Sequence, residues 1–119
     1  MSAVIAQQSA INAETKQLHD NLIAQHQALS DRLSTVTSAD DADAIVREMQ
    51  EINFRVMISG GLLFKQTTAQ IDGNLQSVIA AGADLKTAIA QADRIRDIIK
   101  ATSKFLGLVD KVLDKIKLL

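Results

Sequence analysis

Apolar residues recur along the first third of the chain at steps of three, four and seven positions. This spacing places them on one face of a helix, and it is followed by Ile11, Leu18, Leu22, Leu29, Leu33 and Val36. The pattern predicts a first helix over about residues 3–36. We expect a second helix after Ser38, because serine caps early backbone N–H groups and Asp40, Asp41 and Asp43 favour the positive end of a helix dipole.

From residue 57 onward an apolar residue occupies every seventh position. These positions are Met57, Phe64, Ile71, Val78, Leu85, Ala92, Ile99, Leu106 and Leu113. A seven-residue repeat of this length is typical of helices that pack side by side in a coiled coil. The repeat passes Gly60 and Gly61 without a change of phase, so we interpret Gly60 as a point of close contact within a long helix. A kink and a loop are the less favoured alternatives.

Two turn sequences, centred on Gly73 and Gly82, compete for the next chain reversal. We favour Gly82, because it gives helices over about residues 39–81 and 84–118 that can pair with the first helix along most of its length. The expected fold is all-α. It is a single domain over residues 1–119, an elongated antiparallel three-helix bundle with coiled-coil-like heptad packing. The alternative has a single turn near the first boundary and one continuous second helix.

Composition restricts the chemistry that such a bundle could perform. The 119 residues include no Cys, Trp, Tyr or Pro. Without cysteine the chain has no disulfide, no thiolate metal site and no thiol nucleophile. The net charge of −1 gives little attraction to nucleic acid. The sequence contains neither a signal peptide nor an apolar run long enough to span a membrane, so the expected location is the cytoplasm, with signal-less secretion left open.

The titratable residues form no recognisable catalytic or metal-binding motif. His19 and His26 are separated by ~10 Å along a helix, too far to chelate one ion together. The acidic residues after Ser38 lie where helix capping explains them. The basic residues between positions 94 and 104 alternate with aspartates and have no aromatic stacking partner. We therefore expect no enzymatic activity, no cofactor, no metal and no nucleic-acid partner.

The C-terminal segment, residues 104–119, has a broad apolar face with Lys111, Asp114 and Lys115 opposite. Such a helix can form a wall of the bundle core, bind a groove on a partner, or lie on a membrane surface. We favour the core wall, then a protein partner or self-association, and last a membrane. A membrane-surface helix usually carries more positive charge and an interfacial Trp.

The sequence predicts a non-enzymatic helical interaction or scaffold protein that acts through helix-face contacts. Its expected partner is another protein chain or a copy of itself. The alternative is a membrane-surface-active or secreted helical component, of a pore-forming, coating or secretion-apparatus type, that uses the C-terminal amphipathic helix. The candidate contact residues lie in the uncharged middle of the chain and on the C-terminal face: Met57, Ile58, Gly60, Leu62, Leu63, Phe64, Phe105, Leu108, Val112 and Leu119.

Overall fold

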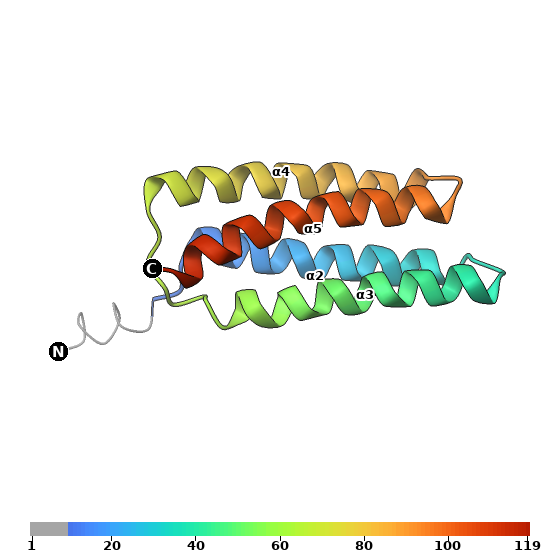
Figure 1. Cartoon of the computed structure of the whole chain (residues 1–119), viewed down its shortest axis with the longest axis horizontal. Coiled ribbons are helices and arrows are strands. Elements are labelled where there is room, and N and C mark those ends of the chain that lie inside the picture. Colours follow the sequence, from blue (N-terminus) through green and yellow to red (C-terminus); the bar gives the residue numbers. More distant parts are fainter. Residues whose placement is uncertain (1–9) are drawn as a thin grey trace.

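The computed structural model describes residues 10–119, and this part of the chain forms four helices without any strand. They are α2 (Ala13–Leu33), α3 (Ala39–Gly60), α4 (Ala69–Gln91) and α5 (Ile95–Lys117) (Figure 1). The all-α class predicted from the sequence is confirmed. The three-helix bundle is wrong, because the chain reverses once more than the glycine pattern indicates. The beginning of the predicted first helix falls outside the described residues.

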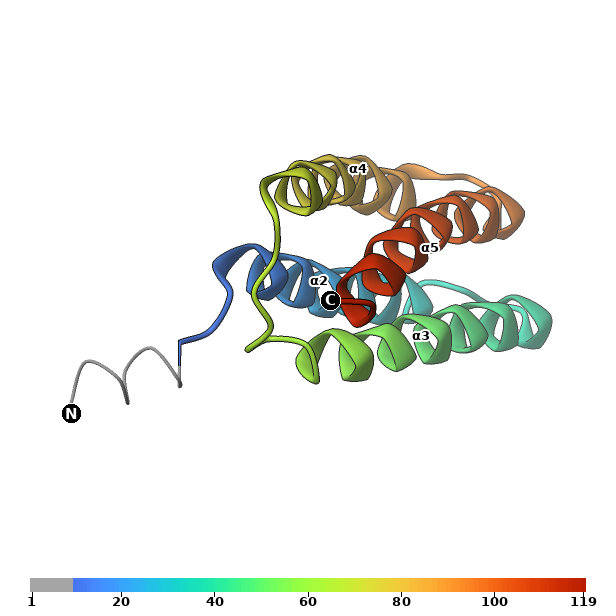
Figure 2. The ribbon, with the colours of Figure 1, turned by 60° about the vertical axis from the view of Figure 1, so that its left-hand side comes forward.

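The four helices form two antiparallel hairpins, α2–α3 and α4–α5, that pack against each other (Figure 1, Figure 2). Across the hairpins, α2 contacts α4 and α3 contacts α5, and in the described chain the α2·α5 and α3·α4 pairs make no comparable contact. The connection from α3 to α4 therefore crosses the end of the bundle diagonally. Each helix is ~32–35 Å long, so the hairpins share their full length.

Three of the four helices begin with a side-chain cap. Asn12 accepts a hydrogen bond from the N–H of Thr15 at 2.9 Å, and Thr68 accepts one from Ile71 at 3.2 Å. Ser38 accepts one from the N–H of Asp41 at 3.0 Å, which confirms the boundary predicted there. The start of α5, after Arg94, has no side-chain cap.

The interpretation of Gly60 as a point within a long helix is wrong. Gly60 is the last residue of α3, and Gly61 caps it and opens a connector over residues 61–68. The first half of the connector is apolar, and its Leu62 packs against the core at the end of the bundle. One element of the prediction holds: a Cβ on Gly60 would lie 3.3 Å from Cε1 of His19, so α2 approaches α3 closely there.

The predicted turn at Gly82 is also wrong, and so is its alternative at Gly73. Both glycines lie within α4. Gly82 is buried and faces α2, where a Cβ would overlap the side chain of Asn21. The chain instead reverses at residues 92–94, which contain no glycine.

The seven-residue repeat is a core pattern only inside helices. Ile71, Val78 and Leu85 are buried in α4, and Leu106 and Leu113 are buried in α5. Met57, near the end of α3, and Phe64, in the connector, are exposed. These two residues match the spacing of the repeat but do not belong to the core. The seven-residue spacing therefore continues across two connectors, although no single continuous helix contains it.

Candidate interaction surface

The ten candidate contact residues fall into three environments. The exposed group is Met57, Phe64, Leu108 and Leu119. The half-buried group is Ile58, Gly60, Leu62 and Leu63. Phe105 and Val112 are 2% and 4% exposed and belong to the core, so they present no surface to a partner.

The broad apolar face of the C-terminal segment lies inside the bundle. Ile98, Phe105, Val109, Val112 and Ile116 of α5 are all buried against the other helices. The favoured interpretation of this segment, a wall of the core, is thereby confirmed. A partner or a membrane can reach this face only if α5 leaves the bundle.

Figure 1 shows that α2 begins and α3 and α5 end at the same end of the bundle. By their places in the chain, most of the exposed large apolar residues belong to this end. We call this set the terminal patch: Ile11, Phe54, Met57, Phe64, Leu118 and Leu119. Hydrogen bonds between neighbouring residues connect the chain segments that carry the terminal patch. The N–H of Asn12 donates to the carbonyl of Leu63 at 2.6 Å, and Nζ of Lys65 donates to the carbonyl of Lys117 at 3.3 Å.

The size of the terminal patch exceeds what isolated surface residues explain. Phe54 is 57% exposed, Met57 69% and Phe64 58%. Taking ~200 Å² for a whole large residue, the six residues together expose on the order of 700 Å² of surface. The largest patch on a typical monomer covers about 300–600 Å² and is often functional, and one partner in a standard interface contributes about 800 Å².

A charge network fixes the part of α3 that carries the patch. The guanidinium of Arg55 binds both carboxylate oxygens of Asp110 on α5 at 2.9 Å, and it also binds Glu51 at 2.7 Å. The hydrogen bond with Asp110 raises the pKa of Arg55 above its ordinary value. The same guanidinium lies 5.9 Å from the ring centroid of Phe54. Phe54 was not among the predicted contacts, although it lies one helical turn before Met57.

A polar contact joins α2 to α3 beside this end of the bundle. His19 Nδ1 lies 2.9 Å from Oγ of the buried Ser59, and that hydroxyl donates to the carbonyl of Val56 at 3.0 Å. Since the serine proton is directed at the backbone, the imidazole N–H is the donor to Ser59. The arrangement positions α2 and α3 relative to each other.

A second polar contact joins α2 to α4 in the interior. Nε2 of the buried Gln25 donates to the carbonyl of Gly82 at 2.5 Å and to Oδ1 of Asn21 at 3.3 Å. Gly82 has no side chain, so the Gln25 amide reaches the α4 backbone directly. This contact sets the register of the two parallel helices.

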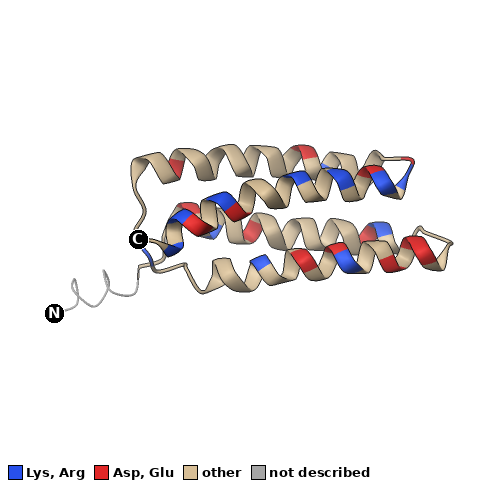
Figure 3. Ribbon diagram, viewed as in Figure 1, with Lys and Arg blue, Asp and Glu red and all other residues tan. Residues whose placement is uncertain are grey.

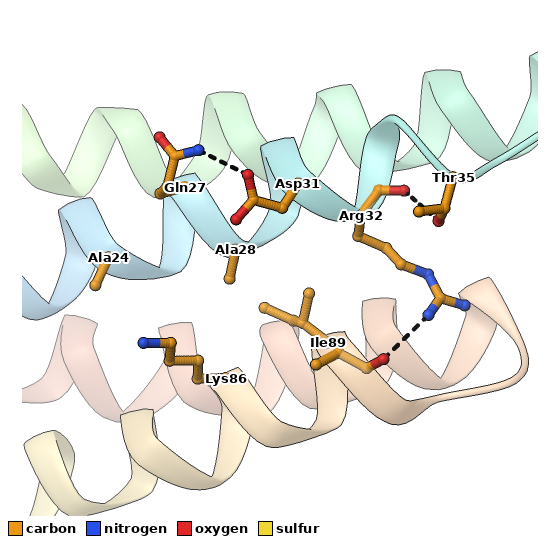
Figure 4. A pocket seen from close by; sticks show the side chains of 9 residues that line it. Ala24, Gln27, Ala28, Asp31, Arg32, Thr35, Lys86 and Ile89 are labelled. Carbon is orange, nitrogen blue, oxygen red and sulfur yellow. Dashed lines mark hydrogen bonds between the residues drawn. The ribbon is translucent and has the colours of Figure 1, made fainter.

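The groove between α2 and α4 contains a hollow of about 390 Å³ (Figure 4). Ala24 and Ala28 face Ile89 across it, and polar residues form the rim. Two of the rim groups have partners within the chain: Gln27 donates to Asp31 at 2.8 Å, and Arg32 donates to the carbonyl of Ala92 at 2.6 Å. Arg32 thereby closes the C-terminal end of α4 from a neighbouring helix.

Within residues 10–119, no group of three or more His, Asp or Glu side chains is arranged to hold a metal ion. None of the helices in this part of the chain has the length and apolarity needed to cross a membrane. Comparisons with protein-family models, with curated proteins and with solved structures found no match. The terminal patch is therefore the feature on which a functional argument rests.

Proposed function

We propose that this protein is a non-enzymatic helical interaction protein that associates with other protein chains, copies of itself included, through the terminal patch. The observation that carries the proposal is the exposure of Phe54, Met57 and Phe64 together at one end of a bundle whose core is complete without them. Full burial of each such side chain contributes about 1.5–3 kcal/mol. Three of them can therefore supply much of the free energy of a stable contact.

The neighbourhood of the patch suits a protein partner. The chain carries no charged residue between Arg55 and Lys65. Ion pairs and hydrogen bonds fix the flanking residues Arg55 and Asn12, so the patch is held in one shape before a partner arrives. Preorganisation of this kind reduces the entropy lost on binding.

Sedimentation velocity over a wide range of protein concentration tests the proposal. At about 0.5 M salt, where contacts between exposed charges are screened, we expect the mass of the natural protein to rise above that of a monomer, and the double variant Met57→Lys with Phe64→Lys to stay monomeric. Lysine near the C-terminus of α3 is favourable for the helix dipole, so the fold should persist. The matched control is Ile23→Lys, an exposed apolar residue in the middle of α2. A natural protein that stays monomeric throughout, or equal effects of control and patch variants, would contradict the proposal.

A membrane surface is the second candidate, and one observation favours it. Leu118 is 87% exposed and adjoins Leu119, and the nearby cations are Lys65, Lys115 and Lys117. Exposed leucines beside lysines suit the interface of an anionic bilayer. Co-sedimentation with phosphatidylglycerol vesicles should then fall for Leu118→Asp combined with Leu119→Asp. Point variants are preferable to removal of residues 105–119, because that deletion destroys the core.

A further inference from the structure

The two hairpins of the bundle carry opposite net charge (Figure 3). Residues 10–60, which include α2 and α3, contain eight acidic and four basic side chains, a net charge of −4. Residues 61–119, which include α4 and α5, contain six acidic and nine basic side chains, a net charge of +3. The total charge is therefore close to zero although the first hairpin is acidic and the second is basic.

Four of the nine basic residues of the second hairpin are arranged in one line. Lys100, Lys104, Lys111 and Lys115 are exposed and follow each other at steps of four, seven and four residues, so they share one face of α5 over ~22 Å. No carboxylate oxygen in residues 10–119 lies within 4.0 Å of their ammonium groups. Leu108, 37% exposed, stands in the middle of this lysine row.

A groove between α4 and α5 runs beside the lysine row. It contains two hollows of about 250 and 160 Å³ that share Leu108 as a wall. Small residues of both helices open the larger hollow, among them Ala81, Ala88 and Ala101. Lys104 and the single carboxylate Asp84 border the larger hollow, and Lys111 and Lys115 border the smaller one, so cations outnumber carboxylates three to one along the groove. A concave apolar floor with a cationic rim fits a protruding helix with acidic residues better than it fits a flat bilayer.

We propose that this groove binds the acidic first half of α3 from a second copy of the chain. Between residues 39 and 51, α3 carries five acidic side chains and one basic one: Asp40, Asp41, Asp43, Glu48 and Glu51 against Arg47. This acidic stretch is ~17 Å long, close to the length of the lysine row. The exposed Val46 lies near its middle and supplies an apolar group for the groove.

The contact joins two different surfaces of the molecule. Within one copy α3 and α4 occupy diagonal positions and do not touch, so the acidic helix and the basic groove face different directions. A copy whose groove is occupied still presents its own α3 to the next copy. Head-to-tail contacts of this kind build a closed ring where the rotation between copies closes, and an open-ended string where it does not. The inference shares with the proposed function the claim that copies associate, but it uses a surface separate from the terminal patch.

Mixing of complementary charge variants tests this arrangement. The groove variant carries Lys104→Glu with Lys111→Glu, and the helix variant carries Asp40→Lys with Asp43→Lys. Each variant alone should lose about tenfold to a hundredfold in association constant, measured by sedimentation. Their equimolar mixture should regain association, because the intact α3 of the groove variant fits the intact groove of the helix variant and the two charge-reversed surfaces are again opposite in sign.

Controls separate this contact from a general effect of charge and from the terminal patch. Lys86→Glu with Arg94→Glu makes the same change of charge outside the lysine row and should associate like the natural protein. Association should weaken as salt rises from about 0.02 to 0.5 M. The Met57→Lys and Phe64→Lys double variant should retain this salt-sensitive part even if the terminal patch is essential for the rest. Circular dichroism establishes that every variant is folded, and the neutral pair Lys104→Gln with Lys111→Gln replaces the groove variant if it is not.

A natural protein that is monomeric at low salt would overturn the inference. Groove variants that associate normally, or a mixture that associates no better than its components, would also overturn it. If the Met57→Lys and Phe64→Lys variant loses all association while the groove and helix variants keep theirs, this inference is wrong and the proposed function is supported.

Discussion

The helices α4 and α5 have the same length and form one hairpin, yet they are built on different principles. The buried residues of α5 are large and apolar apart from Thr102, and its outer face carries the lysine row. In α4 the charged residues are limited to Asp72, Asp84 and Lys86, and its buried face includes Gly82. The packing of α5 is determined by its own pattern of apolar and charged side chains. The packing of α4 depends instead on side chains that neighbouring helices contribute.

The largest expected effect tests the role of α5 as a wall of the core. Phe105→Ala should lower the free energy of unfolding by about 3–5 kcal/mol, because a fully buried aromatic side chain leaves a cavity. Leu108→Ala, one turn along on the groove side, should cost about 1 kcal/mol or less. Urea unfolding followed by circular dichroism measures both. Equal costs would mean that α5 is not packed as the structure describes.

The glycines of α4 provide the next comparison, since the same substitution should act in opposite directions at two positions. Gly73 has nothing within 4 Å of an added Cβ, so Gly73→Ala should stabilise the helix by about 1 kcal/mol. At Gly82 the added Cβ meets Asn21, whose carboxamide accepts the hydrogen bond from Gln25. Gly82→Ala should therefore destabilise the protein by about 1 kcal/mol.

A double-mutant cycle identifies the cause of that difference. In an Asn21→Ala background the collision is absent, and Gly82→Ala should become stabilising, as it is at Gly73. A Gly82→Ala variant that stays destabilised in this background would place the conflict elsewhere in the α2–α4 interface.

These glycines also show where reasoning from the sequence stops. The pattern of α5 predicts its buried face, because Ile98, Phe105, Val109 and Val112 follow helical spacing. The end of α4 carries no such signal. Its last carbonyls accept hydrogen bonds from Arg32, which lies about sixty residues earlier in the chain. Gly82, a strong turn signal by itself, serves a contact between helices that local sequence does not encode.

The terminal patch was partly visible in the sequence for a related reason. Met57 and Phe64 lie in an uncharged run, and both are exposed. Phe105 and Val112 have the same apolar character but are buried, because an apolar stripe looks alike whether it faces a core or a partner. Phe54 stands between Asn53 and Arg55, and its exposure follows from the direction of α3 in the bundle. Only the packing of the helices distinguishes these cases.

The N-terminal ends of α4 and α5 differ because only α4 has a side-chain cap. We expect this difference to have a moderate effect on the free energy of unfolding. Thr68 caps α4 through a hydrogen bond to the N–H of Ile71, whereas α5 starts after Arg94 without one. Arg94→Ser should raise the free energy of unfolding by about 0.5–1 kcal/mol, and Thr68→Ala should lower it by about 1 kcal/mol. Thermal unfolding of both variants, with Arg96→Ser as a control for the lost charge, measures the difference. An equal gain in the control would assign the effect to charge.

The smallest expected effect lies on α3, the other neighbour of α5. Burial raises the pKa of Glu48 above its ordinary value, the nearby Glu51 adds to the rise, and Arg47 and Arg55 oppose it. A raised carboxyl pKa means that the folded state disfavours the ionised form, so this cost is absent at acidic pH and develops as pH rises through the ordinary and then the raised pKa. Glu48→Gln should therefore stabilise the protein at neutral pH by less than about 1 kcal/mol and lose this advantage below about pH 4. Melting temperatures of both proteins across that range measure the difference, and the exposed Glu51→Gln serves as the comparison. An advantage that is independent of pH would show that the cost of ionising the half-buried Glu48 is not its source.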